Sequence, residues 1–143
     1  IFKLLKDISQ DKPILGICLG MQLLFKNSNE FGLCEGLNLI EGEVRSLREV
    51  NQNKNLKIPN IGWNEILINK KNDILKKKDF FYFVHSYYPK VEDEKIILAY
   101  TKFGNIKFPS AILKDNLLGC QFHPEKSGMV GLNMIKNFFK NNV

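Results

Sequence analysis

The chain has 143 residues, 44% of them hydrophobic, and a formal net charge of +6 at pH 7. This size and apolar content suit one domain with a buried core, and no apolar run approaches the length of a membrane span. The basic residues are nearly all lysine, with Arg45 and Arg48 as the two arginines. Because nucleic-acid surfaces usually combine arginine with interleaved aromatic residues, we expect neither a nucleic acid nor a membrane as a partner.

The cysteines indicate a cytoplasmic protein without a disulfide framework. Cys18, Cys34 and Cys120 are scattered and odd in number, and no signal peptide is recognisable in the sequence, which is typical of a reducing compartment. A metal site would need clustered ligands such as Cys-x-x-Cys, so we expect no metal. We expect Cys120 to pack within an apolar strand and Cys34 to lie in a loop.

Helical periodicity marks the two ends of the chain, and strand patterns occupy the middle. Apolar residues recur at helical spacing over 1–9 and again over 129–139. Near the first helix, an apolar strand at 14–15 leads through a glycine-flanked turn to a helical run at 21–25. Neither a repeat nor a linker divides the chain, so we expect one domain over residues 1–143. The remaining strand patterns cover residues 39–44, 65–68, 80–85, 96–100, 111–113 and 117–122.

Cys18 stands in the middle of the first strand-to-helix turn, between Gly16 and Gly20. A sharp turn of this kind needs small residues on both flanks, because its backbone approaches its neighbours closely. The sulfur would face the positive end of the helix, which favours the reactive thiolate, and the Leu19 amide would form half of an oxyanion hole. Taken alone, the pattern fits a buried structural cysteine equally well.

A second motif supplies the groups that a nucleophilic cysteine needs. His123 and Glu125 lie two residues apart at the polar end of the apolar run 117–122. Residues i and i+2 of an extended segment face the same way, so Glu125 can orient the His123 ring. Cysteine, histidine and an orienting acid are the components of an acyl-transfer triad. Cys18, His123 and Glu125 are therefore the predicted catalytic residues.

The two motifs and two further segments resemble the class I glutamine amidotransferases, in particular the glutaminase subunits of imidazole glycerol phosphate synthase. The resemblance implies a three-layer, flavodoxin-like α/β domain with a mostly parallel central sheet. Family members carry further strands and a glycine loop upstream of the nucleophile strand, so we expect the type-1 amidotransferase domain over 1–143 to be incomplete at its N-terminus. The segments that carry the resemblance are Pro13–Leu24, Ile61–Asn64, Tyr82–Tyr88 and Gln121–Gly128.

The implied activity is hydrolysis of L-glutamine to glutamate and ammonia, with no cofactor. By resemblance, the side chain of Gln22 binds the amino-acid end of the substrate, and Ser86 and Tyr87 contribute backbone contacts. His85 ends an aromatic strand, and the family places this segment along the glutamine pocket. We therefore expect His85 to line the pocket and not to act as the catalytic base.

The implied partner is a (β/α)8-barrel cyclase subunit, which uses the ammonia to make imidazole glycerol phosphate and aminoimidazole carboxamide ribotide in histidine biosynthesis. Trp63, Asn64 and Lys126 are the predicted partner contacts, with core packing as the alternative for Trp63. Two other functions stay open. Asn60, where the family commonly has histidine, and the loop 30–32 fit a paralogue that supplies ammonia for amidation of a cell-surface sugar. A missing N-terminal part would fit an inactive module that only binds the partner.

Overall fold

The computed structural model describes residues 1–30, 32–76 and 78–142, so the middle residue of the loop 30–32 lies outside the described residues. The helices are short except for the last one. In chain order the elements are α1 (Phe2–Ile8), β1 (Ile14–Ile17), α2 (Leu19–Leu23), β2 (Phe25–Ser28), β3 (Cys34–Glu35), β4 (Ile40–Ser46), α3 (Leu47–Val50), β5 (Asn60–Ile68), β6 (Phe80–His85), β7 (Tyr87–Val91), η1 (Glu94–Ile96), β8 (Ile97–Phe103), β9 (Ile106–Lys114), β10 (Leu117–Cys120), η2 (Pro124–Lys126) and α4 (Gly128–Asn142).

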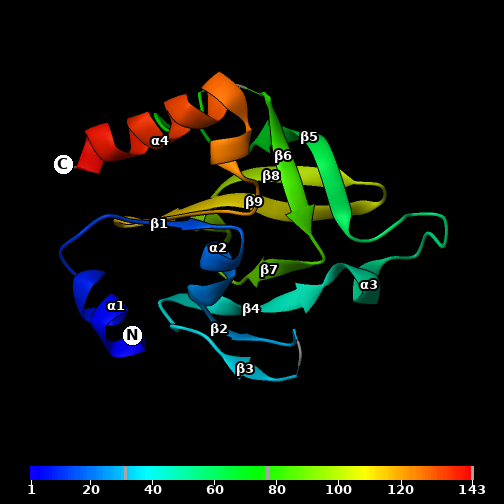
Figure 1. Ribbon diagram of the computed structural model, residues 1–143, viewed down its shortest axis with the longest axis horizontal. Coiled ribbons are helices and arrows are strands. Elements are labelled where there is room, and N and C mark those ends of the chain that lie inside the picture. Colours follow the sequence, from blue (N-terminus) through cyan, green and yellow to red (C-terminus); the bar gives the residue numbers. More distant parts are fainter. Residues whose placement is uncertain (31, 77, 143) are drawn as a thin grey trace.

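Two sheets organise the fold (Figure 1). The larger has six strands in the order β1-β10-β9-β8-β5-β6, and the smaller has four in the order β3-β2-β4-β7. Figure 1 shows α4 along one side of the larger sheet, with α2 and the smaller sheet on the other side. This arrangement of helices and sheets confirms the predicted α/β class.

The larger sheet is mixed, and the expectation of a mostly parallel sheet is corrected here. β1 and β10 pair in parallel, whereas β10–β9, β9–β8, β8–β5 and β5–β6 are antiparallel. β8, β9 and β10 follow one another through short turns in which Gly104 and Asp115 take positive φ angles. A tight turn connects antiparallel strands, because a parallel pair needs a long crossover. The parallel pairing therefore joins strands from opposite ends of the chain.

The predicted helices at both ends are confirmed by α1 and α4, and the six strand patterns correspond to β4, β5, β6, β8, β9 and β10. β2, β3 and β7 were not predicted from the sequence. Phe25, expected in a helix, begins β2, and Cys34, expected in a loop, lies in the two-residue β3. Pro89 lies within β7, where a proline normally argues against a strand. The buried position of Cys120 is confirmed.

Two hydrophobic clusters hold the helices against the sheets. Met134 and Phe138 of α4 belong to the cluster that also contains Phe81 and Phe83 of β6. Met21 and Leu24, from α2 and its C-terminal end, belong to a second cluster with residues of β4 and β9. Buried apolar area is the main stabilising contribution in such clusters. The second cluster fixes α2, and therefore the turn that leads into it, between the two sheets.

The turn between β1 and α2 requires close backbone approach. Cys18 has φ 51° and ψ −106°, a conformation that residues with side chains rarely adopt and that is often found at functional sites. A Cβ atom added at Gly16 would lie 2.7 Å from the backbone carbonyl carbon of Gly20. A Cβ atom added at Gly20 would meet nothing within 4 Å. The structure thus assigns the steric requirement to Gly16, and the expectation that both glycines must be small is wrong for Gly20.

Gly16→Ala and Gly20→Ala form a matched pair that tests this assignment. We expect Gly16→Ala to lower the free energy of unfolding by roughly 2 kcal/mol or more, because the new methyl group collides with backbone. Gly20→Ala should be neutral or stabilising by up to about 1 kcal/mol, because alanine favours the helix. Urea unfolding of the complete protein measures both values. Equal losses in the two variants would contradict the assignment.

Candidate active site

The parallel pairing of β1 with β10 brings the two sequence motifs to one edge of the sheet. Ile17, the last residue of β1, lies opposite Cys120, the last residue of β10. The Cys18 amide then donates to the Cys120 carbonyl at 2.8 Å. Since the carboxyl ends of parallel strands meet at the same edge, Cys18 and the segment beginning at Gln121 emerge side by side.

Among the described residues, three groups form hydrogen bonds with the Cys18 sulfur. The Gln121 side chain donates from Nε2 to Sγ at 3.6 Å, and the thiol donates to the Val84 carbonyl at 3.8 Å. The backbone amide of Leu19 also hydrogen-bonds to the sulfur. The Leu19 amide thus lies beside the sulfur, and its role in an oxyanion hole stays a prediction. Gln121 is a contact that the sequence analysis did not identify.

Burial raises the pKa of the Cys18 thiol above its ordinary value. The hydrogen bonds from Leu19 and Gln121 lower this pKa, and the carboxylates of Glu125 and Glu30 raise it further. Desolvation is the largest of these effects because it disfavours the charged thiolate. The expectation that the start of the helix would make the thiolate the favoured form is therefore corrected: in the resting protein, burial outweighs the amides.

His123 and Glu125 form the predicted pair. His123 Nδ1 and Glu125 Oε1 are 2.7 Å apart. An ionised carboxylate only accepts hydrogen bonds, so the ring carries its proton on Nδ1 and leaves Nε2 as the basic nitrogen. Within the described part of the chain, Nε2 is buried and has no hydrogen-bond partner. Among these residues, no hydrogen bond joins His123 to Cys18.

The backbone around His123 is held on both sides. Its amide donates to the Tyr82 carbonyl at 2.8 Å, and the Ser127 hydroxyl donates to its carbonyl at 2.6 Å. Ser127 also accepts from the Tyr82 amide at 3.0 Å. These bonds attach the segment that contains His123 to β6, which borders the candidate pocket.

A pocket of about 180 Å³ opens beside Cys18. It gathers all four residues that the resemblance assigned to substrate binding, together with the nucleophile candidate and the oxyanion candidate. Glu30 also lines it. This pocket position was not predicted from the sequence, because a single loop carboxylate has no distinguishing pattern. His123 and Glu125 are not among its lining residues, which are Cys18, Leu19, Gln22, Glu30, Val84, His85, Ser86 and Tyr87.

His85 is buried and both of its ring nitrogens are occupied. Nδ1 lies 2.8 Å from the Tyr87 carbonyl, and Nε2 lies 3.0 Å from Asn60 Nδ2. Asn60 Oδ1 in turn accepts from Asn64 Nδ2 at 3.0 Å. Burial lowers the pKa of His85 to about 4. The ring is therefore neutral at pH 7, with its proton on Nδ1, because a carbonyl oxygen can only accept.

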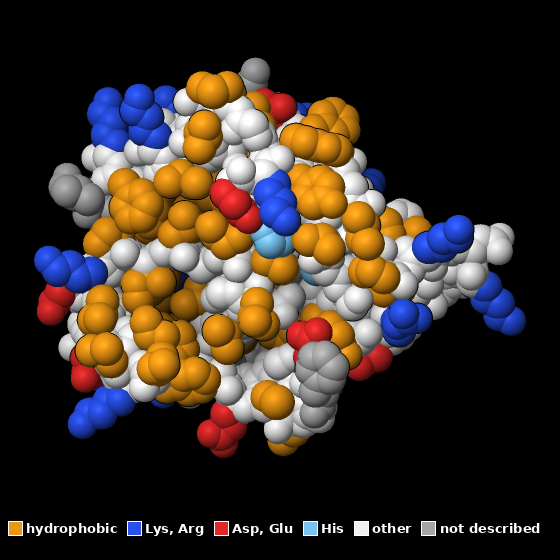
Figure 2. Space-filling model, viewed as in Figure 1, with side chains coloured by type: hydrophobic (Ala, Val, Ile, Leu, Met, Phe, Trp, Pro, Cys, Tyr) orange, Lys and Arg blue, Asp and Glu red, His pale blue; other side chains and the backbone are white. Residues whose placement is uncertain are grey.

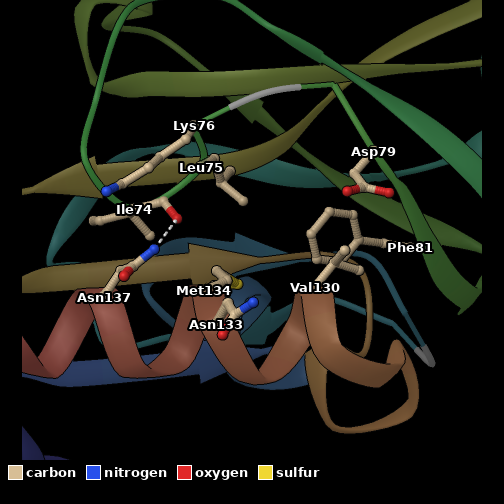
Figure 3. A pocket seen from close by; sticks show the side chains of 9 residues that line it. All are labelled: Ile74, Leu75, Lys76, Asp79, Phe81, Val130, Asn133, Met134 and Asn137. Carbon is tan, nitrogen blue, oxygen red and sulfur yellow. Dashed lines mark hydrogen bonds between the residues drawn. The ribbon is translucent and has the colours of Figure 1, made fainter.

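A larger hollow of about 430 Å³ lies between α4 and the chain that leads into β6 (Figure 3). Its walls are mainly apolar, and Asn137 Nδ2 closes one side by donating to the Ile74 carbonyl at 3.3 Å. It is lined by neither cysteine nor histidine. The chemistry that the sequence predicts therefore belongs to the smaller pocket. The lining residues are Ile74, Leu75, Lys76, Asp79, Phe81, Val130, Asn133, Met134 and Asn137.

Two of the three predicted partner residues are exposed, and the third is half-buried. Trp63 is 56% exposed on β5, with Ile61 and Phe80 exposed nearby, so core packing, the alternative for Trp63, is not what the structure shows. Lys126 is exposed in η2. Asn64 is half-buried, and its side chain bonds to Asn60 on the opposite face of β5 from Trp63.

No basic stripe crosses the face that Figure 2 shows, and no metal site is evident among the described residues. Figure 2 shows hydrophobic side chains over much of the viewed face, with most Lys and Arg side chains at its margins. Over residues 1–30, 32–76 and 78–142, no group of three His, Cys, Asp or Glu side chains is placed to hold a metal ion. In the same regions, no helix has the length and apolar character needed to cross a membrane.

Comparison with known proteins identifies close relatives. The profile described as Glutamine amidotransferase class-I matches residues 2–142. The imidazole glycerol phosphate synthase subunit HisH of Caldanaerobacter subterraneus subsp. tengcongensis is 48% identical over 92% of this chain and 63% of the relative. The HisH subunit of Pyrococcus furiosus is 44% identical over 94% of this chain and 68% of the relative. The chain thus spans about two thirds of the length of these curated relatives.

Solved structures share the fold at low sequence identity. A glutamine amidotransferase matches with a TM-score of 0.68 at 17% identity, covering 98% of this chain and 67% of that one. A glutamine amidotransferase from Thermotoga maritima matches with a TM-score of 0.61 at 17% identity, covering 98% of this chain and 53% of that one. Because the family profile extends over nearly the whole sequence, this chain belongs to the class-I glutamine amidotransferase family.

Proposed function

We propose that this chain is the glutaminase part of an imidazole glycerol phosphate synthase. The observation that carries the proposal is the strained turn that presents Cys18 to a pocket, with the Leu19 amide directed at its sulfur. The names of the relatives, among them the 48% identical HisH subunit, support the histidine pathway as the destination of the ammonia. They favour this partner over the sugar-amidating paralogue, which would use the same pocket.

In the proposed reaction, the Cys18 sulfur attacks the side-chain carbonyl carbon of glutamine. The thiol proton passes to Nε2 of His123, and the Leu19 amide donates to the oxyanion that forms on the carbonyl oxygen. His123 then returns the proton to the leaving nitrogen, ammonia departs, and a γ-glutamyl thioester remains. Water attacks the thioester with His123 as the base, which releases glutamate and restores the thiol.

Glu125 acts in this scheme by holding the His123 ring. Its carboxylate accepts from Nδ1 at 2.7 Å, so Nε2 stays the basic nitrogen in both half-reactions. The buried and unpaired state of Nε2 in the described structure supports this role, because a nitrogen without a partner is available to take a proton.

The other pocket residues suit the amino-acid end of glutamine. The Glu30 carboxylate is placed in the pocket wall, and a carboxylate attracts the substrate ammonium group. Gln22 lies in the same wall, with its Nε2 held by the Tyr87 carbonyl at 3.1 Å. Ser86 also lines the pocket. His85 supports the wall and does not act as the base, because both ring nitrogens are already engaged.

The cyclase subunit is the proposed partner, and the outer face of β5 and β6 is its proposed docking surface. Trp63, Ile61 and Phe80 are exposed there, and contiguous exposed apolar residues mark interaction sites. Val84, at the end of β6, also lines the pocket, so a partner on this surface would lie beside the site of ammonia release. Lys126 would contact the partner by charge, and Asn64 would support β5 from its inner side.

Cys18→Ser tests the nucleophile, with Cys34→Ser as its matched control. We expect Cys18→Ser to reduce glutamate release by roughly 10³-fold or more, because a serine hydroxyl is much less acidic, and so a weaker nucleophile here, than the cysteine thiol. Cys34 is exposed, and its replacement should leave the rate unchanged. Glutamate release is measured with the complete protein, with and without the cyclase subunit and its ribotide ligand.

Retained activity in Cys18→Ser would contradict the nucleophile assignment. Absence of any stimulation by the cyclase subunit would contradict the proposed partner while leaving the glutaminase chemistry in place.

The low pKa of His85 predicts a loss of stability in mild acid. This pKa falls from its ordinary value of 6.5 to about 4 on folding, so the unfolded chain binds more protons between these values. The contribution of neutral His85 to the free energy of unfolding is therefore fully present above about pH 6.5. It is lost as the pH falls to about 4, and the total loss is about 3 kcal/mol.

Urea unfolding at a series of pH values, compared between the parent and His85→Gln, measures this contribution. The parent should lose more stability than the variant between about pH 6.5 and pH 4, because glutamine does not titrate. Identical pH profiles would show that His85 is not kept neutral by its burial.

A further inference from the structure

We propose that Gln121, a residue outside the triad, holds the Cys18 sulfur for attack by donating a hydrogen bond to it, and that the Tyr87 carbonyl fixes the direction of this bond through Gln22. The proposal rests on the proposed function, in which Cys18 is the nucleophile. Gln121 Nε2 lies 3.6 Å from Cys18 Sγ. The amide nitrogen of Gln121, and not its oxygen, therefore faces the sulfur.

The Tyr87 carbonyl assigns a direction to each side-chain amide in turn. A backbone carbonyl only accepts hydrogen bonds, so Gln22 must present its amino group to this oxygen, at 3.1 Å. The same amino group lies 3.1 Å from Gln121 Oε1 and donates to it. Because Gln121 Oε1 accepts from Gln22, the Gln121 amino group is the end of the amide that faces the sulfur. The orientation of both amides thus follows from one acceptor.

The same carbonyl oxygen also accepts from His85 Nδ1, at 2.8 Å. Two donors match the two lone pairs of a carbonyl oxygen, so Tyr87 is fully engaged. His85 is in turn held by Asn60 at 3.0 Å. The Tyr87 carbonyl, which orients Gln22 and Gln121, is therefore also held in place by the buried, neutral ring of His85.

Burial makes the alternative orientation costly. Gln121 is 0% exposed and Gln22 is 6% exposed, so water does not replace a lost partner. Rotating the Gln121 amide by half a turn would place two amino groups opposite each other and a carbonyl oxygen against the sulfur. Buried polar groups without partners are strongly disfavoured. The Gln121 backbone is fixed as well, because its amide donates to the Ser110 carbonyl at 3.0 Å.

The consequence for the chemistry is a sulfur that is oriented and more easily ionised. A hydrogen bond to a charged acceptor is stronger than one to its neutral form, so the Gln121 amide favours the thiolate over the thiol. Burial raises the pKa of Cys18, and the Leu19 and Gln121 donors oppose that rise. Gln121 is the side-chain member of this pair of donors, and it can therefore be removed by substitution.

The test is the pH dependence of Cys18 alkylation by iodoacetamide, which requires no glutamine. The complete protein is used with Cys34→Ser, and the Cys18 adduct is quantified by mass spectrometry. Gln121→Met keeps the size of the side chain and removes its donor. We expect the rate at neutral pH to fall about tenfold, with rates at the alkaline plateau within about twofold of the parent. Thr101→Val, which removes a buried hydroxyl bonded to the Glu65 carbonyl, should leave the profile unchanged.

Gln22→Met is the second variant, and it covers the case in which Gln121→Met does not fold. It should shift the alkylation profile in the same direction, because Gln121 loses the group that orients its amide. Combining the two substitutions should add little to the effect of Gln121→Met alone. A parental profile in the folded variants would overturn the proposal. Variants that lose glutamine hydrolysis but keep the parental alkylation profile would overturn it equally. If the variants shift the profile but the parent protein has no glutaminase activity, the role of Gln121 is supported and only the proposed function is contradicted.

Discussion

The close approach of Gly16 to the backbone of Gly20 is the constraint on which the candidate site depends. It allows β1 to turn directly into α2, with Cys18 in a strained conformation at the corner. The parallel pairing of β1 with β10 then places this corner beside the segment that starts at Gln121. Two motifs separated by most of the sequence meet because one strand from each end of the chain lies in the same sheet.

A buried polar network surrounds this corner and gives its side chains defined orientations. Tyr87 contributes a backbone carbonyl, and Gln22, Gln121 and His85 arrange their donors and acceptors around it. In a region of low exposure, each of these groups is stable only while its partners are in place. The network connects the wall of the pocket to Asn60 on β5. The strand that carries the exposed Trp63 is therefore also the strand that supports the pocket from within.

The sequence predicted the parts of the site whose chemistry lies in residue type and spacing. Cys18 in a glycine-flanked turn, and His123 two residues before Glu125, follow from local patterns, and the structure places these residues at one edge of the sheet. What could not be predicted depends on tertiary packing. The raised pKa of Cys18 comes from burial in the assembled pocket, and the contact of Gln121 with the sulfur comes from strand pairing. β7 was missed because Pro89 interrupts its pattern, although Tyr87 in that strand directs the network.

Reaction of the complete protein with a diazoketone analogue of glutamine, followed by peptide mapping, tests directly whether Cys18 is the nucleophile. The analogue occupies the glutamine pocket, and a nucleophilic sulfur there displaces dinitrogen and forms a stable thioether. We expect one adduct, on Cys18, and excess glutamine should prevent its formation. An adduct on Cys34 or Cys120 in its place, or labelling of Cys18 that glutamine does not affect, would contradict the claim that this turn holds the nucleophile of a glutaminase.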